Sequence, residues 1–223
     1  MSPPPQSVAP RLDILPPAQA ALWRELSQAP ATFTLYDGTA LALQLGHRQS
    51  VDFDFFGAAF DPDELAKSLP FLASAEIVQR APSTLTVRVD RGGPVLVSFF
   101  GVPELGRVRP PLSASDNGVL LANLVDIAGM KASVVQKRAA AKDYVDVAAL
   151  IGAGITLGVA LAAGRAIHGA SFNPQITLKA LSYFEDVGDL PSETKRLLQD
   201  AVRGVDVNAI PMLTAIGKIG GPA

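Results

Sequence analysis

The sequence contains no cysteine and only two histidines among its 223 residues. Without thiols, the chain has no disulfides, no cysteine nucleophile and no thiolate-liganded zinc site. His47 and His168 lie far apart in the sequence, which excludes a histidine-rich metal site as well. Any metal ion that the protein binds is therefore expected to be a hard, oxygen-liganded ion such as Mg²⁺ or Mn²⁺.

The sequence also lacks a strong excess of either charge. Its formal net charge is −2 and its pI is near 5.7. This balance gives no general attraction to nucleic acid or to anionic membranes, so a contact with nucleic acid would need a local basic patch. With 48% hydrophobic and 18% charged residues, the composition is that of a globular protein of one large or two small domains.

Targeting and membrane-spanning patterns are missing too. Residues 1–17 have no basic region followed by an apolar run, so no signal peptide is expected. The longest apolar stretch, from Val145 to Ile167, contains Asp146, Arg165 and several glycines, which makes it a poor membrane span. We therefore expect a cytoplasmic protein that does not bind a membrane.

The chain is expected to divide into three parts. The proline-rich residues 1–16 predict a flexible arm, residues 17–118 an α/β core, and residues 119–223 a helical C-terminal region. The core is predicted to hold a small mixed or antiparallel sheet of four or five strands, including a hairpin at Arg91-Gly92-Gly93. The predicted C-terminal helices are residues 123–138, 140–151, 156–167, 174–184, 192–203 and 207–218. The predicted fold class is α+β.

Two aspartates stand one residue apart in the expected strand that follows Ser50. Side chains alternate between the two faces of a strand, so Asp52 and Asp54 share one face with Ser50. Val51, Phe53 and Phe55 are expected on the opposite face, in the core. Carboxylates this close repel each other unless a cation lies between them.

A turn and a short apolar helix precede this strand by about a dozen residues. Gly38, at the start of that helix, would let a phosphate approach backbone N–H groups, and Thr39 follows it. Carboxylates on a neighbouring strand could hold divalent metal ions that bridge the phosphates of a nucleotide. The combination predicts a nucleotidyltransferase site, and the alternative is a turn glycine beside a solvated strand face.

A second group of charges lies in the helical half. Lys131 and Arg138 are seven residues apart, so in one continuous helix they share a face, as do Asp143 and Asp146, three residues apart. A lysine and an arginine aimed into an acidic cleft would neutralise a triphosphate, with the aspartates orienting them. The alternative is an ordinary salt-bridge network in a helical hairpin.

The run DGTALALQLGHRQSVDFDFF, residues 37–56, resembles the AbiEii/AbiGii-type nucleotidyltransferases, the toxin components of abortive-infection and toxin–antitoxin systems. Their first pattern is Gly-Gly/Ser-Thr followed by Arg-x-Ser-x-Asp-hydrophobic-Asp. Their second, Lys-x6-Arg-x4-Asp-x2-Asp, falls without a gap on four residues of this chain: Lys131, Arg138, Asp143 and Asp146. The resemblance extends over roughly residues 20–215.

The resemblance implies a polymerase-beta-like nucleotidyltransferase fold and Mg²⁺-dependent (or Mn²⁺-dependent) transfer of a nucleotidyl group from an NTP. It implies a tRNA end, another RNA or a protein hydroxyl as the acceptor, and a cognate antitoxin as a partner. The metal ligands it implies are Asp52 and Asp54, and the catalytic set adds Lys131, Asp143 and Asp146. The nucleotide-binding residues it implies are Gly38, Thr39, Arg48, Ser50, Lys131 and Arg138.

Two positions depart from the family pattern. The family usually has glycine where this chain has Asp37; an aspartate caps a helix well, but its charge weakens phosphate binding. A later strand commonly carries a third carboxylate, and the equivalent position here is Ser98, which does not ionise at neutral pH. Both departures favour an alternative in which the protein binds a nucleotide or a protein partner without turnover. A third, weaker alternative is a purely structural helical partner.

Overall fold

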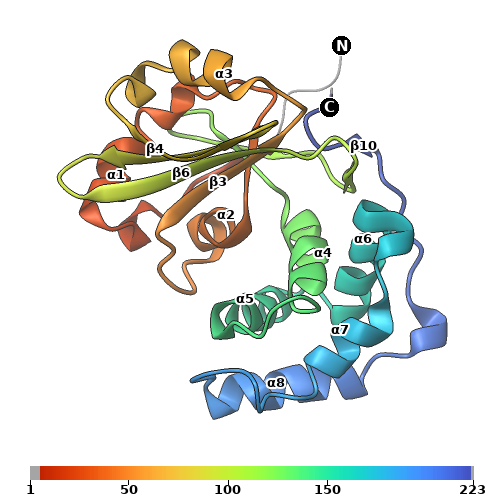
Figure 1. Cartoon of the computed structure of the whole chain (residues 1–223). Helices are drawn as coiled ribbons and strands as arrows, with labels where there is room; N and C mark the ends of the chain where they lie inside the picture. Colours follow the sequence, from red (N-terminus) through yellow and green to blue (C-terminus); the bar gives the residue numbers. More distant parts are fainter. Residues whose placement is uncertain (1–5, 222–223) are drawn as a thin grey trace. The chain divides into compact units, whose positions relative to one another are not determined.

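The computed structural model describes residues 6–221, and the chain divides into two compact units. The sheet unit comprises the chain up to Leu105, Pro110–Ala122 and the segment from Gly217. The helical unit comprises Gly106–Arg109 and Asn123–Ile216. Figure 1 colours both along the sequence.

The sheet unit is built on one eight-stranded mixed sheet, with the strand order β1-β8-β9-β2-β3-β6-β5-β4. The aspartate-bearing strand β3 runs antiparallel to β2 and parallel to β6. The strands of this sheet are β1 (Ser7–Val8), β2 (Thr34–Tyr36), β3 (Asp52–Gly57), β4 (Glu76–Ala81), β5 (Thr84–Asp90), β6 (Pro94–Gly101), β8 (Leu112–Ala114) and β9 (Leu120–Leu121).

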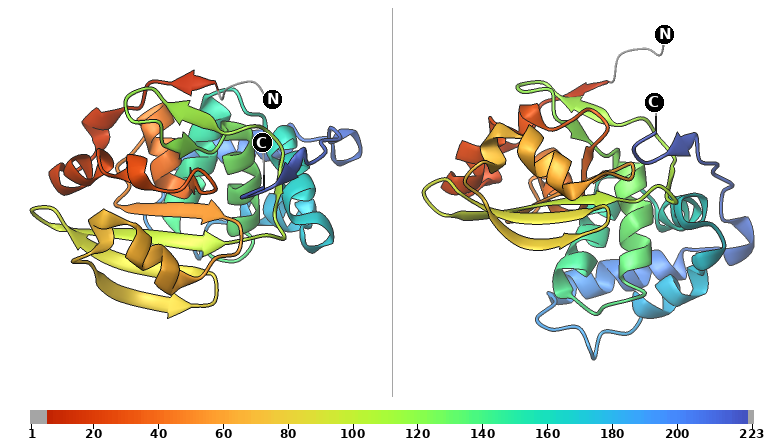
Figure 2. Two further views of the ribbon diagram at one scale, coloured as in Figure 1. Left: turned by 90° about the horizontal axis from the view of Figure 1, so that it is seen from above. Right: turned by 45° about the horizontal axis from the view of Figure 1, so that its top comes forward.

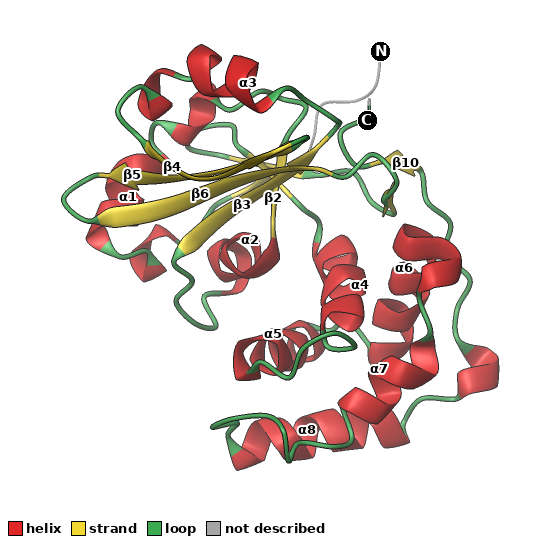
Figure 3. Ribbon diagram, viewed as in Figure 1, coloured by secondary structure: helices red, strands yellow, loops and turns green. Residues whose placement is uncertain are grey.

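Three helices accompany the sheet: α1 (Pro17–Trp23), α2 (Asp37–Leu45) and α3 (Pro62–Ser68). Asp61 caps the start of α3, because its carboxylate accepts hydrogen bonds from the N–H groups of Asp63 and Glu64. Pro62 occupies the first helical turn, where no intrahelical donor is needed. In Figure 3, α3 lies above the strands and α2 below them.

Aromatic side chains fill the core on one face of the sheet. Phe53 and Phe55 of β3 are buried, and their rings stack on Trp23 and Phe99, respectively. Phe33 packs edge-on against Phe99. Burial of several large rings gives this face most of its stabilisation and fixes the orientation of β3, because a slip of one residue would turn Phe53 and Phe55 to the other face.

The helical unit contains five α-helices: α4 (Leu124–Val134), α5 (Ala141–Gly152), α6 (Leu157–His168), α7 (Pro174–Ala180) and α8 (Ser192–Arg203). Asn123, Thr156 and Asn173 cap three of them with side-chain oxygens. Gly129 of α4 lies against Ala163 of α6, where a Cβ atom on residue 129 would come within 2.8 Å of the α6 backbone. Small residues thus let the two helices pack closely. Figure 2 gives two further views of these helices.

The fold class α+β is confirmed, and the structure corrects two details. The sheet has eight strands rather than four or five, because β1, β8 and β9 are too short to show a periodic pattern. The predicted helix at residues 207–218 is wrong. That segment holds a short 3-10 turn, Val207–Ala209, and the strand β10 (Gly217–Lys218), since Pro211 breaks a helix.

The predicted flexible arm falls only partly on the described residues. Residues 1–5 lie outside them, while Ser7–Val8 pair with β8 and Arg11 donates its backbone N–H to Leu43. The flexibility of the arm stays a prediction. Within residues 6–221, no single helix is long and apolar enough to cross a membrane, and α5 with Leu157–Ser171 meets the criteria only as a pair bent by 116°.

Candidate functional site

Asp52 and Asp54 lie on the face of β3 opposite its buried phenylalanines. Both aspartates are half-buried, whereas Phe53 and Phe55 are fully buried, which confirms the predicted alternation. Val51 differs from the prediction: β3 begins only at Asp52, and the Val51 side chain is 60% exposed instead of lying in the core. The strand thus presents two carboxylates on a surface held rigid from behind.

Ser98 lies next to Asp54 across the sheet. The two residues are in register between the parallel strands β3 and β6, so their side chains share a face. The Ser98 hydroxyl accepts a hydrogen bond of 3.3 Å from Thr86 of β5. The position at which a third carboxylate was anticipated therefore holds a buried hydroxyl, bound to a neighbouring threonine that the sequence did not indicate.

The start of α2 forms a small polar cradle within the same unit. A Cβ atom on Gly38 would lie 2.5 Å from Nη2 of Arg48 and 2.9 Å from Oγ of Ser50. Only glycine leaves room for these two side chains over the first turn of the helix. A guanidinium, a hydroxyl and the N-terminal N–H groups of a helix are suitable donors for a phosphate.

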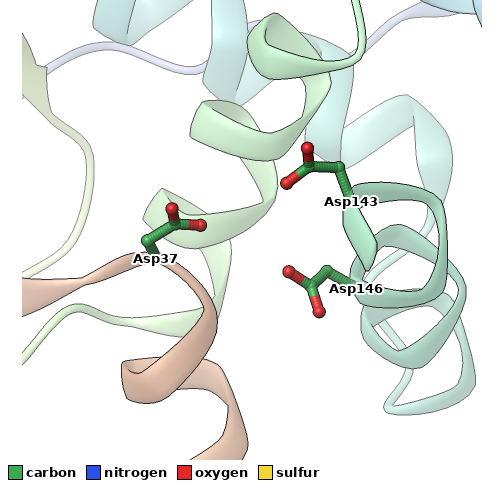
Figure 4. Close-up of side chains that lie close together, drawn as sticks. All are labelled: Asp37, Asp143 and Asp146. Carbon is green, nitrogen blue, oxygen red and sulfur yellow. The ribbon is translucent and has the colours of Figure 1, made fainter. Parts of the chain in front are cut away.

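The first residues of α2 differ from the predicted cap. The N-cap residue is Tyr36, no side chain caps this helix, and Asp37 is its first residue with a φ of 56° (Figure 4). The prediction that Asp37 caps the helix is therefore wrong. A left-handed φ is one that glycine adopts without strain and aspartate tolerates, which fits a family pattern with glycine there. Thr39 is buried, and its hydroxyl donates to the Asp52 carbonyl oxygen at 2.5 Å, tying α2 to the start of β3.

The second group of predicted residues forms a buried ionic cluster inside the helical unit. Nζ of Lys131 lies 2.9 Å from Asp143 and 2.7 Å from Asp146. Lys131 is 1% exposed and both aspartates are fully buried. The two carboxylates project from the same side of α5, as their spacing of three residues predicts (Figure 4).

Arg138 joins this cluster from outside the helix. The prediction of one continuous helix through Lys131 and Arg138 is wrong, because α4 ends at Val134. Arg138 instead donates from Nε and Nη2 to both oxygens of Asp143, and its side chain stays 48% exposed. Burial alone would raise the pKa of Asp143, but Arg138 and Lys131 hold it below its ordinary value. The cluster is the network that the salt-bridge alternative describes, and triphosphate binding by Lys131 and Arg138 stays a prediction.

Asp126 is a buried carboxylate that the sequence did not indicate. It lies in the first turn of α4 and accepts the N–H groups of Val108 and Arg109 at 2.8 and 2.9 Å. Burial raises its pKa to about 6, although these two hydrogen bonds act in the opposite direction. Its contacts assign it to fixing the segment Gly106–Arg109 on α4. An isolated aspartate in an apolar run carries no spacing that would reveal this role.

A family model matches the part of the chain that contains both groups of residues. The model described as "Nucleotidyl transferase AbiEii toxin, Type IV TA system" matches residues 20–206. The chain belongs to the AbiEii nucleotidyltransferase toxin family. The predicted resemblance is thereby confirmed, and both motifs lie within the matched residues.

Two proteins similar to this AbiEii chain are distant from it in sequence. An uncharacterized protein of Aquifex aeolicus (strain VF5) is 32% identical over 117 residues, which cover 51% of the chain and 55% of that relative. The structure is similar to that of MenT4, a nucleotidyltransferase toxin from Mycobacterium tuberculosis H37Rv, with a TM-score of 0.56 and 14% identity. The match covers 85% of this chain and 83% of MenT4. At that identity the likeness shows a shared fold.

The donor chemistry of the AbiEii sheet face suits a hard divalent ion. Asp52 and Asp54 supply carboxylate oxygens from one strand face, and such ligands are those that Mg²⁺ and Mn²⁺ prefer. Asp143 and Asp146 also place carboxylate oxygens within 4.8 Å of each other, but Lys131 and Arg138 already form ion pairs with them. We therefore regard Asp52 and Asp54 as the better fit for a metal.

Proposed function

We propose that this AbiEii-family protein transfers a nucleotidyl group from an NTP to an RNA or protein acceptor, with a divalent metal ion. The observation that carries the proposal is the cradle at Gly38, where Arg48 and Ser50 lie against the helix start in space that a side chain would fill. The family membership and the carboxylates of β3 support the same activity.

The proposed reaction joins an acceptor oxygen to the α-phosphorus of the NTP and releases pyrophosphate. Gly38, Thr39, Arg48 and Ser50 would bind and orient the phosphates, Thr39 through its backbone because its hydroxyl is already bonded to Asp52. Lys131 and Arg138 would add positive charge for the triphosphate. Asp143 and Asp146 would position these two cations.

Asp52 and Asp54 would hold Mg²⁺ or Mn²⁺, which, when bound, neutralises phosphate charge and polarises the oxygens around the reacting phosphorus. Because Ser98 does not ionise at neutral pH, carboxylate chemistry at this position of the sheet would rest on Asp52 and Asp54 alone. A proton leaving the acceptor hydroxyl would have to pass to one of these carboxylates or to water.

A second candidate is a member of the family that binds a nucleotide or a protein partner without turnover. Ser98 in register with Asp54 favours it, because the carboxylate set is then reduced to two. Asp37 favours it as well, since a negative charge in the first turn of α2 opposes phosphate binding. Both candidates would use the same cradle, so only turnover distinguishes them.

The decisive experiment incubates the protein with each α-labelled NTP, Mg²⁺ and either total tRNA or total protein, and compares it with Asp52→Ala. Label should appear in one acceptor class for the wild type and be lost in the variant. Failure to label any acceptor with any NTP, while labelled NTP still binds, would establish the second candidate instead.

The biological role we propose is that of a toxin with a cognate antitoxin, which the family description supports, acting in the cytoplasm. Expression of the protein alone should slow growth, and Asp54→Ala should relieve the effect at equal protein level. Equal growth of both strains would contradict the toxin role and leave the enzymatic proposal untouched.

A further inference from the structure

The helical unit contains an open pocket beside its buried ionic cluster. The pocket has a volume of about 300 Å³ and lies between the connection from α4 to α5 and α7 with the turn that follows it. Arg138 lines it while bonding to Asp143. The pocket therefore begins at a residue of the second family motif and extends away from it.

Positive charge gathers around this pocket. Lys137 and Lys179 line it from two different elements, and both are exposed. Within residues 6–221, neither lysine forms a side-chain hydrogen bond or an ion pair. Lys142, also exposed and without such a contact in that range, follows shortly in α5. Asp186 is the one acidic residue among those that line the pocket, so the lining carries a net positive charge.

The helical unit as a whole also carries a net positive charge, whereas the rest of the chain is negatively charged. The helical unit has eleven lysines and arginines against nine aspartates and glutamates, a net charge of +2. The rest of the chain has eight against twelve, a net charge of −4. The overall charge of −2 thus conceals a basic unit, and two of its exposed lysines, Lys137 and Lys179, line one pocket.

An exposed aromatic ring completes the pocket. Tyr183, in the turn after α7, is 50% exposed, and Ile176 of α7, which lines the same pocket, is 47% exposed. The Tyr183 hydroxyl donates to Glu185 at 2.5 Å, which restrains the ring at the pocket edge. Beneath it lies the buried ring of Tyr144. A restrained ring beside unpaired ammonium groups offers a base a stacking surface and phosphates a countercharge.

We propose that this pocket binds a single-stranded segment of a nucleic-acid acceptor, with a base against Tyr183 and backbone phosphates at Lys137 and Lys179. The proposal rests on the nucleotidyltransferase function above and assigns its acceptor to nucleic acid rather than protein. A polypeptide backbone carries no regular charge that two unpaired lysines could neutralise, whereas a nucleic-acid strand carries a negative charge at each phosphate. Arg138 joins the acceptor pocket to the residues proposed for the triphosphate.

The test measures fluorescence anisotropy of a labelled 12-nucleotide RNA of mixed sequence with the full chain, without NTP, over a series of salt concentrations. Lys137→Gln with Lys179→Gln should weaken binding about tenfold at low salt and reduce the slope of log K against log[salt] by about 1.4. Tyr183→Ala should weaken binding about tenfold with the slope unchanged, and Tyr183→Phe should restore most of it.

The matched control removes two positive charges elsewhere on the helical unit. Arg165→Gln with Arg196→Gln changes exposed residues of α6 and α8 by the same net charge and should leave the affinity within about twofold. An equal loss in both double variants would mean general attraction to charge and would overturn the assignment. Failure of the wild type to bind the RNA would do the same.

The binding test separates this proposal from the function on which it rests. Anisotropy requires no turnover. RNA binding through Lys137, Lys179 and Tyr183 by a protein without transferase activity would therefore support the RNA-binding pocket and contradict the enzymatic function. Transfer of label to protein alone, with RNA binding unchanged in these variants, would support the enzymatic function and contradict the RNA-binding pocket.

Discussion

The two pairs of aspartates in this chain have opposite surroundings. Asp52 and Asp54 of the sheet unit are half-buried on a strand face, whereas Asp143 and Asp146 of the helical unit are fully buried around Lys131. Carboxylates near water keep their charge at little cost, whereas buried carboxylates keep theirs at a high cost unless a cation or hydrogen-bond donors offset it. The same residue type is therefore accessible on a strand face in one unit and enclosed with its countercharge in the other.

Similar substitutions are therefore expected to have different effects on activity and stability in the two units. A change on the sheet face should reduce activity and leave folding nearly intact, because the side chains there are partly solvated. A change in the buried cluster should reduce stability first, because it leaves charge without a partner in a dry interior. Four predictions test this difference, in order of decreasing effect.

Lys131→Ala should lower the free energy of unfolding by about 3–5 kcal/mol, because it leaves two buried carboxylates facing each other. Chemical denaturation followed by circular dichroism measures it. Lys142→Ala, an exposed lysine at the start of α5, should cost less than about 0.5 kcal/mol. A loss below about 1 kcal/mol in Lys131→Ala would mean that the cluster does not support the helical unit.

Asp54→Asn should lower kcat/KM for nucleotidyl transfer at least about a hundredfold, equivalent to about 3 kcal/mol of transition-state stabilisation, because it removes a charged metal ligand. Its unfolding free energy should change by less than about 1 kcal/mol. Glu76→Gln removes a carboxylate from the exposed edge strand β4 and should leave the kinetics unchanged. If Asp54→Asn instead unfolded the protein, the contrast between the two units would disappear.

Asp126 should make the stability of the helical unit depend on pH. Its folded pKa of about 6 exceeds the ordinary aspartate value, so its contribution is fully present below about pH 4 and is lost as the pH rises through 6. Relative to Asp126→Asn, the wild type should gain about 2–3 kcal/mol in unfolding free energy between pH 7 and pH 4. Urea titrations at both pH values measure this difference, and parallel behaviour of the two proteins would show that Asp126 does not titrate in this range.

Gly38→Ala should have the smallest effect of the four on folding and a selective effect on the nucleotide. The added methyl group would displace Arg48 and Ser50, whose ends can move, so the loss of stability should stay near 1 kcal/mol. The KM for NTP should rise about tenfold, because the phosphate donors are displaced. Gly188→Ala, where no atom lies within 4 Å of the added carbon, is the matched control. An unchanged KM would remove the main support for the cradle.

Much of the sheet unit around the first motif was predictable, because its signals are local. Alternation along β3 placed Asp52 and Asp54 on one face, and Asp61 with Pro62 marked the start of α3. Val51 was misplaced because alternation does not say where a strand begins. The strands β1, β8 and β9 depend on partners distant in sequence, so two or three residues of each show no pattern of their own.

In the helical unit, the motif indicated the residues of the cluster but not its geometry. Spacing placed Asp143 and Asp146 on one face, and this held because α5 is continuous across them. Spacing failed for Arg138, since nothing in the sequence showed that α4 ends at Val134 and that the arginine turns back to Asp143. The role of Asp126 could not be predicted from the sequence for a related reason. Its partners are backbone N–H groups, which every residue but proline provides.

The chain returns from the helical unit to the sheet unit at Gly217, and this affects when the sheet unit can fold during synthesis. The segment from Gly217 belongs to the sheet unit, where Ile219 is buried and donates its N–H to Leu105. Gly220, at a φ of 81°, lies so close to Gly57 and Ala58, at the end of the aspartate strand, that a Cβ atom would meet their backbone within 2.4 Å. Domains generally fold as units while the ribosome is still working. Here the sheet unit lacks this piece until the residues from Gly217 emerge, so the sheet unit should complete its fold only after the whole helical unit has been synthesised.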